Sequence, residues 1–451
     1  MKQLQLTSTQ TGKKSLFKSV QPGVVIMYGC GITPYDYSHI GHARSAITCD
    51  TLVRVLKALD YKVMYIRNVT DVDDKILIKA AGTENPYDFQ EITKPYIEDF
   101  DNQMELIGCL KPMVEPLVTE HIPEIINLIG ILMDRGYAYR IEHDIYYDIS
   151  KFSNYCKLSH RNLDDLIAGA RVEHKKDDKR NPGDFVLWKG NDEDLFWQSP
   201  WGYGRPGWHI ECSAMIDTYC KDRPLDIHAG GADLIFPHHE NEIAQSEPAF
   251  DHDLANTWVH TAMLSIDKEK MSKSLGNIII LHTITKEVEP LALRLYFLQH
   301  VYHTPMHYSS ASLEAAEKAF YKLHAVLSDV VMPKIKVPLS KMFYGTFLDH
   351  AFDAMIDDLN TSKALGLIFE NLGEIKKSKE LQQLTKLFLH ELLGLAMKPQ
   401  EITEDQEEMT PEVAALLLER EEARAEKNWA RADMLRDKLK DLGYEVVDRK
   451  S

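Results

Sequence analysis

The sequence predicts an α/β fold built on a doubly wound parallel sheet and followed by a helical C-terminal region. In residues 24–69, a short apolar run, an amphipathic helical pattern and a second apolar run succeed one another, which is the pattern of a βαβ unit. A third apolar run at 225–228 ends in glycines, as expected for the second part of the same sheet. Beyond about residue 311, the sequence no longer alternates between strand and helix patterns and shows helical periodicity throughout.

The composition of this 451-residue chain is that of a globular protein with roughly two to four domains. A net charge of −17 argues against a generic nucleic-acid binder, although local patches are still able to contact RNA phosphates. There is no run of about 18 apolar residues and no secretory signal, so we expect a cytoplasmic protein without a membrane span. The six cysteines are widely separated, and most are expected to be reduced thiols.

The apolar run at 24–28 predicts a buried strand that ends in Gly-Cys-Gly, with Cys30 in the middle. A loop then places His39 and His42 at the start of a helix, where apolar residues recur at helical spacing. A helix start has unpaired N–H groups and a positive dipole end, and both suit a phosphate. This stretch therefore predicts a phosphate site that contains two imidazoles.

A second strand is predicted at 62–69, and the segment after it, 70–75, opens another helix. In a doubly wound sheet the ligand crevice lies at the carboxyl ends of the strands. We therefore expect Thr70 to face the crevice. Asp73 and Asp74 are better explained as charges at a helix N-terminus.

Residues 116–206 differ in character and indicate an insertion into the sheet domain. A helix is predicted at 122–135, and short strands at 138–140 and 144–148. The run of Lys, Asp and Arg at 175–180 is typical of a solvated loop, with nucleic-acid contact as the less favoured interpretation.

The strand predicted at 225–228 leads into Gly230 and Gly231, and Asp233 follows. Glycines allow a ligand to approach the backbone closely, and an acid at this place can accept hydrogen bonds from ribose hydroxyls. The motif is weak alone, but its position at a second crevice of the same sheet favours a nucleotide site.

A metal site is available near this second crevice. His238 and Glu242 are four residues apart and share one face of a predicted helix. Together with Cys30 and Cys212 they would complete a tetrahedral zinc site of mixed soft and hard ligands. The alternative is that both cysteines are buried apolar thiols and that His238 is an ordinary residue at a helix start.

The segment 268–277 carries Lys270 and Lys273, interleaved with serines and followed by Gly-Asn. Such a cationic loop can close over a polyphosphate and stabilise the charge that forms in a transition state. A short lysine motif is more often a solvated turn. Its combination with the histidine loop much earlier in the chain favours the phosphate role.

The helical C-terminal region has a Pro-rich linker at 333–338 and a charged linker at 398–408. An amphipathic, charged helix is predicted at 412–442, with a short strand candidate at 444–447.

His39-Ile40-Gly41-His42 and Lys270-Met271-Ser272-Lys273-Ser274 resemble the two signature motifs of class I aminoacyl-tRNA synthetases. The segments 68–75, 206–215 and 236–242 resemble the cysteinyl-tRNA synthetase family in particular. The resemblance covers nearly the whole chain and implies a Rossmann-type catalytic domain with a connective insertion and an α-helical C-terminal anticodon-binding domain. The implied domains are 1–115 (catalytic, first half), 116–206 (connective insertion), 207–262 (catalytic, second half), 263–312 (lysine loop and stem contact), 313–397 (helical bundle) and 398–451 (anticodon binding).

The resemblance also implies roles for individual residues. The implied zinc ligands are Cys30, Cys212, His238 and Glu242. The implied ATP-binding and catalytic residues are His39, Gly41, His42, Gly230, Gly231, Asp233, Lys270 and Lys273. The implied amino-acid pocket consists of Gly31, Thr70, Trp208 and His228; without the resemblance, core packing would be the preferred explanation for Trp208 and His228. The implied anticodon contacts are Arg424, Trp429, Asp433 and Asp448. For the residues on the last long helix, a salt-bridged helix is an equally good explanation, whereas Asp448 lies beyond that helix.

The implied activity is a two-step ligation. Cysteine attacks the α-phosphate of ATP, with Mg²⁺, to give cysteinyl adenylate, and the 3′-terminal ribose of tRNA(Cys) then accepts the cysteine. One zinc ion would select the substrate thiol. We expect a monomer without an obligate protein partner.

Three other functions fit part of the sequence. A ligase that transfers activated cysteine to a small-molecule amine would keep every catalytic motif. A zinc hydrolase would use Glu211 or Glu240 to activate water, but it leaves the lysine loop unexplained. An RNA-binding protein with structural zinc leaves both phosphate motifs without a role.

Two departures from the family pattern concern tRNA. His303 stands where the family commonly carries Arg, which weakens a stem contact there. The last residues, 448–451, lack the usual Gly- and Trp-containing tail, so we expect a differently built anticodon pocket.

Overall fold

The computed structural model describes residues 2–81, 89–162, 179–193, 195–221, 223–266 and 278–398, the backbone of 269–270, and separate positions between 416 and 438. The chain forms two compact units, Met1–Lys398 and Pro399–Ser451, which are described separately. No helix in these described stretches is long and apolar enough to cross a membrane.

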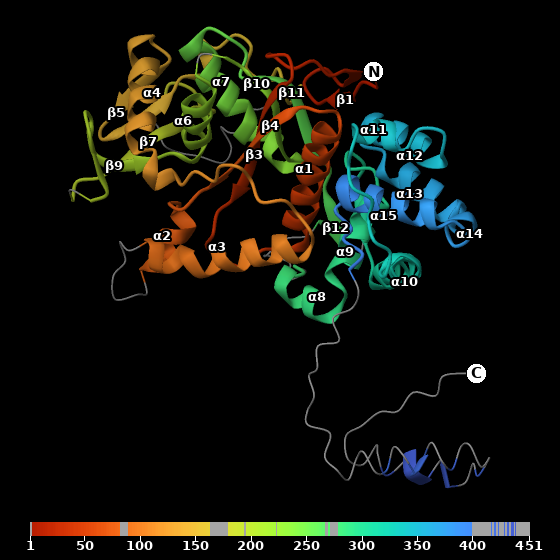
Figure 1. The fold of residues 1–451 in the computed structure, drawn as a ribbon. Helices are drawn as coiled ribbons and strands as arrows, with labels where there is room; N and C mark the ends of the chain where they lie inside the picture. The colour runs from red at the N-terminus through yellow and green to blue at the C-terminus, as the bar shows by residue number, and fades with distance from the viewer. Residues whose placement is uncertain are drawn as a thin grey trace. The chain divides into compact units, whose positions relative to one another are not determined.

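A four-stranded parallel sheet forms the centre of the first unit (Figure 1). Its strand order is β11 (Ala255–Thr261), β10 (Leu225–Gly231), β3 (Val24–Ile32) and β4 (Lys62–Val69). The sheet confirms the predicted α/β class. Strands β3 and β4 are largely buried, which explains the apolar runs that predict them in the sequence. Strands β10 and β11 instead carry buried polar residues such as Asp226, His228 and His260.

Strand β3 is longer than predicted, because it does not end at the Gly-Cys-Gly segment but continues to Ile32. Its register with β4 shifts between Gly29 and Ile32, and the pairing resumes at Ile32 and Val69. The irregularity falls at Cys30 and Gly31, near the carboxyl end of β3, and both residues line the crevice.

Helix α1 (Ile40–Ala58) connects β3 to β4 and lies between the sheet and the C-terminal helices. It is buried over most of its length, including Arg44, Asp50 and Arg54. Helix α2 (Asp74–Ala80) follows β4, with Asp73 as its N-cap, which accepts a hydrogen bond from the Lys75 N–H. The structure thus confirms the helix-terminal role predicted for Asp73. Helix α3 (Phe89–Leu106) runs beside α2.

The insertion carries α4 (Ile122–Asp134) and a five-stranded antiparallel sheet, drawn at the upper left of Figure 1. That sheet has the order β5 (Ala138–Ile141), β6 (Asp144–Tyr147), β7 (Phe185–Gly190), β9 (Gly202–Pro206) and β8 (Trp197–Ser199). Asp74 of α2 forms ion pairs with Lys189 of β7 and Arg205 of β9. The start of α2 is therefore tied to the insertion.

Two helices after the insertion complete the site. Helix α6 (Trp208–Cys220) packs against α7 (Glu240–Phe250), which follows a π-helical turn at Ile235–His239. Short 3₁₀ turns occur at Val118–Glu120, Ile149–Lys151 and Ala232–Leu234.

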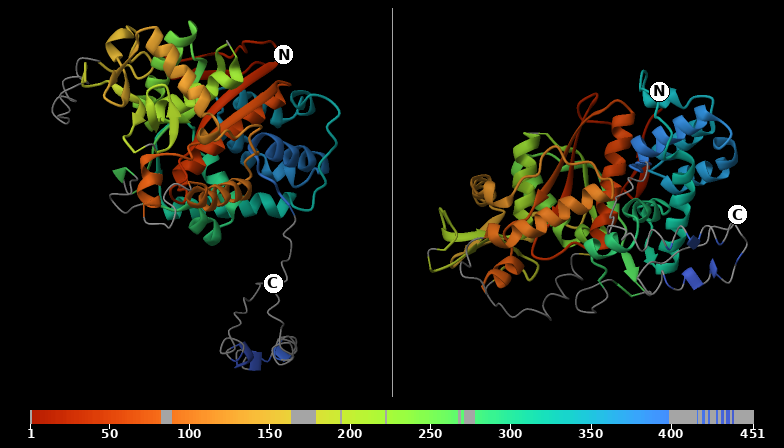
Figure 2. Two further views of the ribbon diagram at one scale, coloured as in Figure 1. Left: turned by 90° about the vertical axis from the view of Figure 1, so that its left-hand side faces the viewer. Right: turned by 60° about the horizontal axis from the view of Figure 1, so that its bottom comes forward.

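The rest of the first unit is mainly helical, and its helices lie beside α1 and the sheet (Figure 2). The helices are α8 (Leu281–Glu287), α9 (Pro290–Leu298), α10 (Ser310–Leu327), α11 (Leu339–Met342), α12 (Phe347–Ile356), α13 (Thr361–Glu370), α14 (Leu372–Ile375) and α15 (Lys379–Leu393). The remaining strands are the hairpin β1 (Gln5–Ser8) and β2 (Lys13–Leu16) and a small sheet of β12 (Leu264–Ile266), β13 (Glu269–Lys270) and β14 (Met306–Tyr308).

A buried charge network joins three of these helices. Asp50 of α1 accepts hydrogen bonds from Arg54 and from Arg294 of α9. Arg54 donates to the His390 carbonyl of α15, and Arg294 donates to the Leu393 carbonyl. The sheet and the C-terminal helices therefore share one core.

In the second unit, the described positions from 416 to 438 are helical apart from Asn428, and Ala423, Ala432 and Leu435 form a small buried cluster with Leu416. Most of the helix predicted at 412–442 and the strand candidate at 444–447 lie outside the described residues.

Candidate active site and metal centre

A cavity of about 360 Å³ lies at the carboxyl ends of the central strands, where a doubly wound sheet binds its ligands. Eight of the predicted site residues line it: Cys30, Gly31, His39, Gly41, His42, Trp208, Gly231 and Asp233. The crevice predicted from the strand ends is therefore present, and it contains residues from both halves of the sheet domain.

The imidazoles of His39 and His42 cap the start of α1. The Nδ1 of His39 accepts a hydrogen bond from the Gly41 N–H at 3.2 Å, and the Nδ1 of His42 accepts one from the His39 N–H at 3.2 Å. The rings are stacked, with centroids 3.8 Å apart. Because each Nδ1 is an acceptor, the proton of each neutral ring lies on Nε2. The pair thus presents two N–H donors of fixed geometry beside a helix N-terminus.

Gly31 leaves no room for a side chain. A Cβ at this position would lie 1.7 Å from the Asn68 carbonyl oxygen. The Gly31 N–H donates to Asn68 Oδ1 at 2.9 Å, and Asn68 also donates to Thr70 Oγ1 at 3.3 Å. Gly31 therefore contributes bare backbone to the cavity. Thr70 is 3% exposed, lies behind that backbone and is not among the lining residues.

The four predicted zinc ligands come together below this backbone. One ligand atom from each of Cys30, Cys212, His238 and Glu242 lies within 4.8 Å of the others. His238 Nε2 is 2.9 Å from Glu242 Oε1, and Cys30 Sγ is 3.8 Å from the same oxygen. Three of the four residues are fully buried, and Cys30 is half-buried at the cavity.

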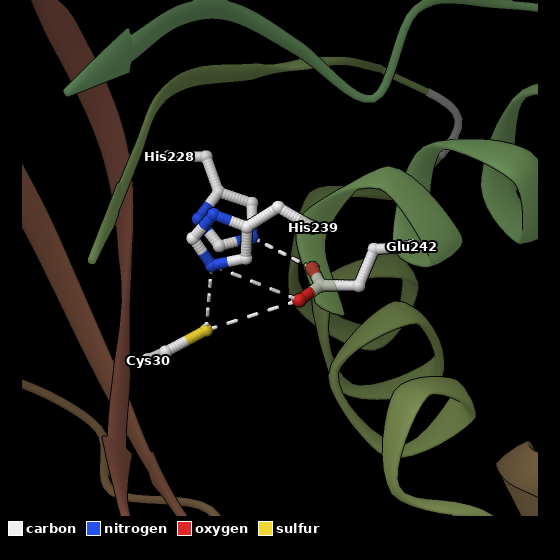
Figure 3. A group of neighbouring side chains, drawn as sticks. All are labelled: Cys30, His228, His239 and Glu242. Carbon is white, nitrogen blue, oxygen red and sulfur yellow. Dashed lines mark hydrogen bonds and ion pairs between the residues drawn. The ribbon is translucent and has the colours of Figure 1, made fainter. Parts of the chain in front are cut away.

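A second group of potential ligands overlaps the first. It consists of Cys30, His228, His239 and Glu242 (Figure 3). His228 Nε2 lies 2.7 Å from Glu242 Oε2, and His239 Nε2 lies 3.2 Å from Cys30 Sγ. In Figure 3 both imidazoles point toward the sulfur and the carboxylate that the two groups share.

Hydrogen bonds behind the imidazoles distinguish the two groups. A metal-ligating histidine normally donates its other ring N–H to a partner. His238 Nδ1 lies 2.9 Å from His209 Nδ1, whereas His228 Nδ1 is buried without a hydrogen-bond partner among the described residues. The group with Cys212 also offers two thiol ligands, which Zn²⁺ favours. The residues of the predicted site therefore fit zinc better than those of the overlapping group.

The charges of the predicted ligands are coupled. The hydrogen bond from Cys30, together with His238, lowers the pKa of Cys212 to about 6 despite its burial. Burial raises the pKa of Glu242, but His228 and His238 outweigh burial and hold the pKa well below its usual range. Burial lowers the pKa of His238, but Glu242 and Cys212 outweigh burial and raise the pKa to about 10, so a positively charged imidazole balances these two acids.

A chain of neutral side chains behind Cys30 was not predicted from the sequence. His239 Nδ1 lies 2.8 Å from His260 Nε2, and His260 Nδ1 lies 2.7 Å from the Thr9 hydroxyl. Burial lowers the pKa of His260 to about 3 and holds the pKa of His239 well below its usual range, which favours the neutral form of both rings. These partners are far apart in sequence, and only the adjacent pair of histidines at 238–239 gives a local signal.

The two aromatic residues of the predicted amino-acid pocket have different surroundings. Trp208 is 39% exposed at the cavity, and its ring stacks on His238 with centroids 4.2 Å apart. His228 is fully buried, stacks on Trp258 and lies at the metal cluster rather than on the cavity lining.

The side of the cavity predicted for the nucleotide follows β10 and β11. Gly231, Asp233 and residues 261–264 line it. A Cβ at Gly230 would lie 2.8 Å from the His239 ring, so this glycine permits close packing behind the lining.

Several predicted site residues cannot be placed. The side chain of Lys270, the whole of Lys273 and the proposed anticodon contacts Arg424, Trp429, Asp433 and Asp448 lie outside the described residues.

The acids of the hydrolase alternative are not arranged to activate water. Both carboxylate oxygens of Glu240 accept backbone N–H groups of Leu158 and Ser159 from the insertion. Glu211 is buried and is not among the residues that line the cavity. His303, the departure from the family pattern, lies 3.4 Å from Asp358.

Three family models match the chain. They are described as "tRNA synthetases class I (C) catalytic domain" over residues 16–318, "DALR domain" over 352–397 and "Cysteinyl-tRNA ligase anticodon binding domain" over 406–451.

Similar proteins and structures agree with these matches. A cysteine–tRNA ligase of Idiomarina loihiensis is 40% identical, over 99% of this chain and 97% of the relative. A cysteine–tRNA ligase of Coxiella burnetii is 42% identical, over 99% of this chain and 98% of the relative. The solved methionyl-tRNA synthetase of Mycobacterium tuberculosis with methionyl-adenylate has a TM-score of 0.58 at 14% identity, covering 82% of this chain and 91% of that one. The last comparison supports the fold alone.

Proposed function

The chain belongs to the cysteinyl-tRNA synthetase family, and we propose that it selects its amino acid by offering the cysteine thiol to a zinc ion. It is a ligase that forms aminoacyl-tRNA, with the catalytic sheet, the helical DALR region and an anticodon-binding segment in one chain. The observation that carries the proposal is the convergence of the four predicted ligands beside the cavity.

The proposed ligands are Cys30, Cys212, His238 and Glu242. Cysteine and serine differ by one atom, and an apolar pocket separates such near-isosteres by only about 1–3 kcal/mol. A bound zinc ion would lower the pKa of a coordinating thiol and hold it as a thiolate, for which a serine hydroxyl is a poor substitute. Selection by this contact would need no separate editing site.

The residues around the cavity suit adenylate formation. The cysteine carboxylate attacks the α-phosphorus of ATP, and pyrophosphate leaves. The Nε2–H groups of His39 and His42 and the start of α1 would stabilise the charge on the phosphates. We propose that Lys270 and Lys273 act from the opposite side, with Mg²⁺ on the ATP, and that Gly230, Gly231 and Asp233 face the adenosine.

The amino acid would lie between the metal centre and the phosphates. We propose that Gly31, Thr70, Trp208 and His228 form its pocket. Gly31 and Trp208 would contact the substrate from the cavity lining, whereas Thr70 and His228 would support that lining from behind.

The second step transfers cysteine to tRNA. A 3′-terminal ribose hydroxyl attacks the adenylate carbonyl, and AMP leaves. We propose tRNA(Cys) as the acceptor, with Arg424, Trp429, Asp433 and Asp448 as anticodon contacts, in a cytoplasmic, monomeric enzyme. The match of residues 406–451 to an anticodon-binding model argues against the alternative in which a small-molecule amine accepts the cysteine.

A Cys212→Ser substitution tests the role of zinc. We expect the variant to lose bound zinc and cysteine-dependent ATP–pyrophosphate exchange together, because one soft ligand of the site is gone. Cys220→Ser on the same helix is the matched control, since Cys220 is also buried but is not part of the metal cluster. Zinc content is measured by elemental analysis, and exchange is measured with cysteine and with serine. Cysteine activation retained by a zinc-free variant would disprove thiol selection by zinc.

A further inference from the structure

A group of partly exposed aromatic rings and two exposed lysines lies beside the active-site cavity. Its members come from the loop between β3 and α1 and from α2, α3 and α8, and they are Tyr35, Tyr37, Lys75, Lys79, Tyr96 and His282. This group is here named the Tyr37 platform. Tyr35, Tyr37 and Lys75 line the cavity itself. Helices α3 and α8, which support the platform, lie side by side at the lower edge of the first unit in Figure 1.

The ring of Tyr37 is held in place although it is 41% exposed. Its centroid lies 5.1 Å from that of Tyr96 and 4.3 Å from that of His282, and both contacts are edge-to-face. The Tyr37 N–H donates to Asp36 Oδ1 at 2.9 Å, which fixes the backbone of the loop. A flat, exposed ring that is already ordered loses little conformational entropy when another flat group stacks on it.

The platform has two exposed ammonium groups in a chain with a net charge of −17. Lys75 Nζ lies 5.0 Å from the centre of the Tyr35 ring, and Lys79 Nζ lies 4.4 Å from that of Tyr96. Lys79 also donates to the Tyr35 carbonyl at 2.9 Å.

The neighbouring acids already have partners. Asp74 is paired with two cations of the insertion, Asp36 accepts the Tyr37 N–H, and Asp99 lies 3.7 Å from His282. These acids therefore do not neutralise the charges of Lys75 and Lys79 beside the rings.

Rings for stacking and lysines for phosphates are the two features that bind unpaired nucleotides without sequence readout. ATP does not need this platform, because Gly231, Asp233 and residues 261–264 provide a nucleotide wall on the β10–β11 side of the cavity. The platform lies on the β3–β4 side, where the second nucleotide-containing substrate remains to be bound.

We propose that the Tyr37 platform binds the unpaired 3′ end of the tRNA, with one base stacked on the Tyr37 ring and the adjoining phosphates near Lys75 and Lys79. This inference rests on the proposed function, since it places the acceptor of the second step. The terminal ribose then enters the cavity next to the adenylate, while the platform takes no part in forming the adenylate.

A Tyr37→Ala variant tests the platform. Base stacking on an aromatic side chain implies a loss of roughly 5- to 150-fold in affinity for tRNA. Tyr37→Phe retains the ring and is expected to bind within about twofold of the wild type. Binding is measured with intact tRNA and with the same tRNA lacking its unpaired 3′ nucleotides. The difference between wild type and Tyr37→Ala is expected only with intact tRNA.

Two controls separate this proposal from its alternatives. Tyr344→Ala removes a tyrosine that is 81% exposed, lies away from the cavity and is expected to have no effect. Cysteine-dependent ATP–pyrophosphate exchange by Tyr37→Ala is expected to match the wild type. A raised KM for ATP would assign the Tyr37 ring to the adenine of ATP and overturn the proposal. An equal loss of affinity for intact and for truncated tRNA would overturn it as well. Absence of exchange in the wild type would refute the proposed function instead.

The exposed Lys75 gives an independent test in case Tyr37→Ala folds poorly. Lys75→Gln is expected to reduce the slope of log Kd against log salt for intact tRNA by about 0.7, the value for one contact to a single-strand phosphate. The slope for truncated tRNA is expected to stay unchanged. An unchanged slope for intact tRNA would remove the lysine from the platform and contradict the proposal.

Discussion

At the scale of single residues, Gly31 and Gly130 show how differently two glycines are used. A Cβ at Gly31 would collide with the Asn68 carbonyl, whereas a Cβ at Gly130, inside helix α4, would meet nothing within 4 Å. Gly31 makes close approach between two strands possible at the cavity. Gly130 has no such role and only weakens its helix.

Gly31→Ala is expected to destabilise the protein by about 1–3 kcal/mol, because strands β3 and β4 must move apart to accept the methyl group. Gly130→Ala is the control and is expected to stabilise by up to about 1 kcal/mol. Urea unfolding followed by circular dichroism measures both. A Gly31→Ala variant as stable as the wild type would show that the bulge adapts at no cost.

Strands β3 and β4 and helix α1 were predictable because their signals are local, whereas β11 was not predicted, because polar residues interrupt its apolar pattern. Strand β4 and the start of α1 agree with the predicted ranges to within a residue or two, since a strand buried on both faces is a continuous apolar run and a helix repeats every 3.6 residues. The predicted end of β3 was wrong, because the pairing of its last residues with β4 resumes only after a bulge.

The parts of the site that rest on local sequence spacing were also predictable. The i,i+4 pair His238 and Glu242 follows from helix geometry. The contact of His239 with His260, and of His260 with Thr9, joins segments that no periodicity connects. Only the folded chain shows these partners.

Helix α1 begins after a residue with two proposed tasks, because His39 caps the helix through Nδ1 and also lines the cavity. His39→Asn keeps a good N-cap and removes the Nε2–H donor. We expect its stability to stay within about 0.5 kcal/mol of the wild type while its adenylation rate falls roughly 10²–10³-fold, as for other lost transition-state donors.

His39→Ala is the companion variant and is expected to lose about 1 kcal/mol of stability as well, because the cap is gone. Thermal unfolding and the rate of ATP–pyrophosphate exchange measure the two effects separately. Equal activity of His39→Asn and the wild type would contradict the role of Nε2.

At the scale of the whole molecule, the network of Asp50, Arg54 and Arg294 connects the sheet to the C-terminal helices through buried charge. Burial raises the pKa of Asp50, but Arg294 and Arg54 outweigh it and leave the pKa below 3.8. Stability from this group is complete above the pKa of the unfolded chain and is lost as the pH falls through the lowered folded value.

Asp50→Asn is expected to cost about 3–5 kcal/mol at neutral pH, because two buried guanidinium groups lose their counter-charge. The variant should also lose less stability than the wild type on acidification below pH 3.8. Glu314→Gln, which breaks an exposed pair with Lys318 on α10, is expected to change stability by less than about 1 kcal/mol. Urea unfolding of both variants and the wild type, measured between neutral pH and pH 3, checks these three expectations. If Asp50→Asn and the wild type lost the same stability on acidification, the proposed role of the Asp50 charge would be wrong.

The same network has a consequence for synthesis on the ribosome. Arg294 follows Asp50 by 244 residues, and the His390 carbonyl that receives Arg54 follows that arginine by 336. At about 5–20 residues per second, Arg294 is made roughly 12–50 s after Asp50. During this interval Asp50 of α1 lacks Arg294, which has not yet been synthesised. The packing of α1 between the sheet and the C-terminal helices is therefore completed only later. Until then the nascent N-terminal half exposes apolar surface of α1 that the later helices cover in the finished protein.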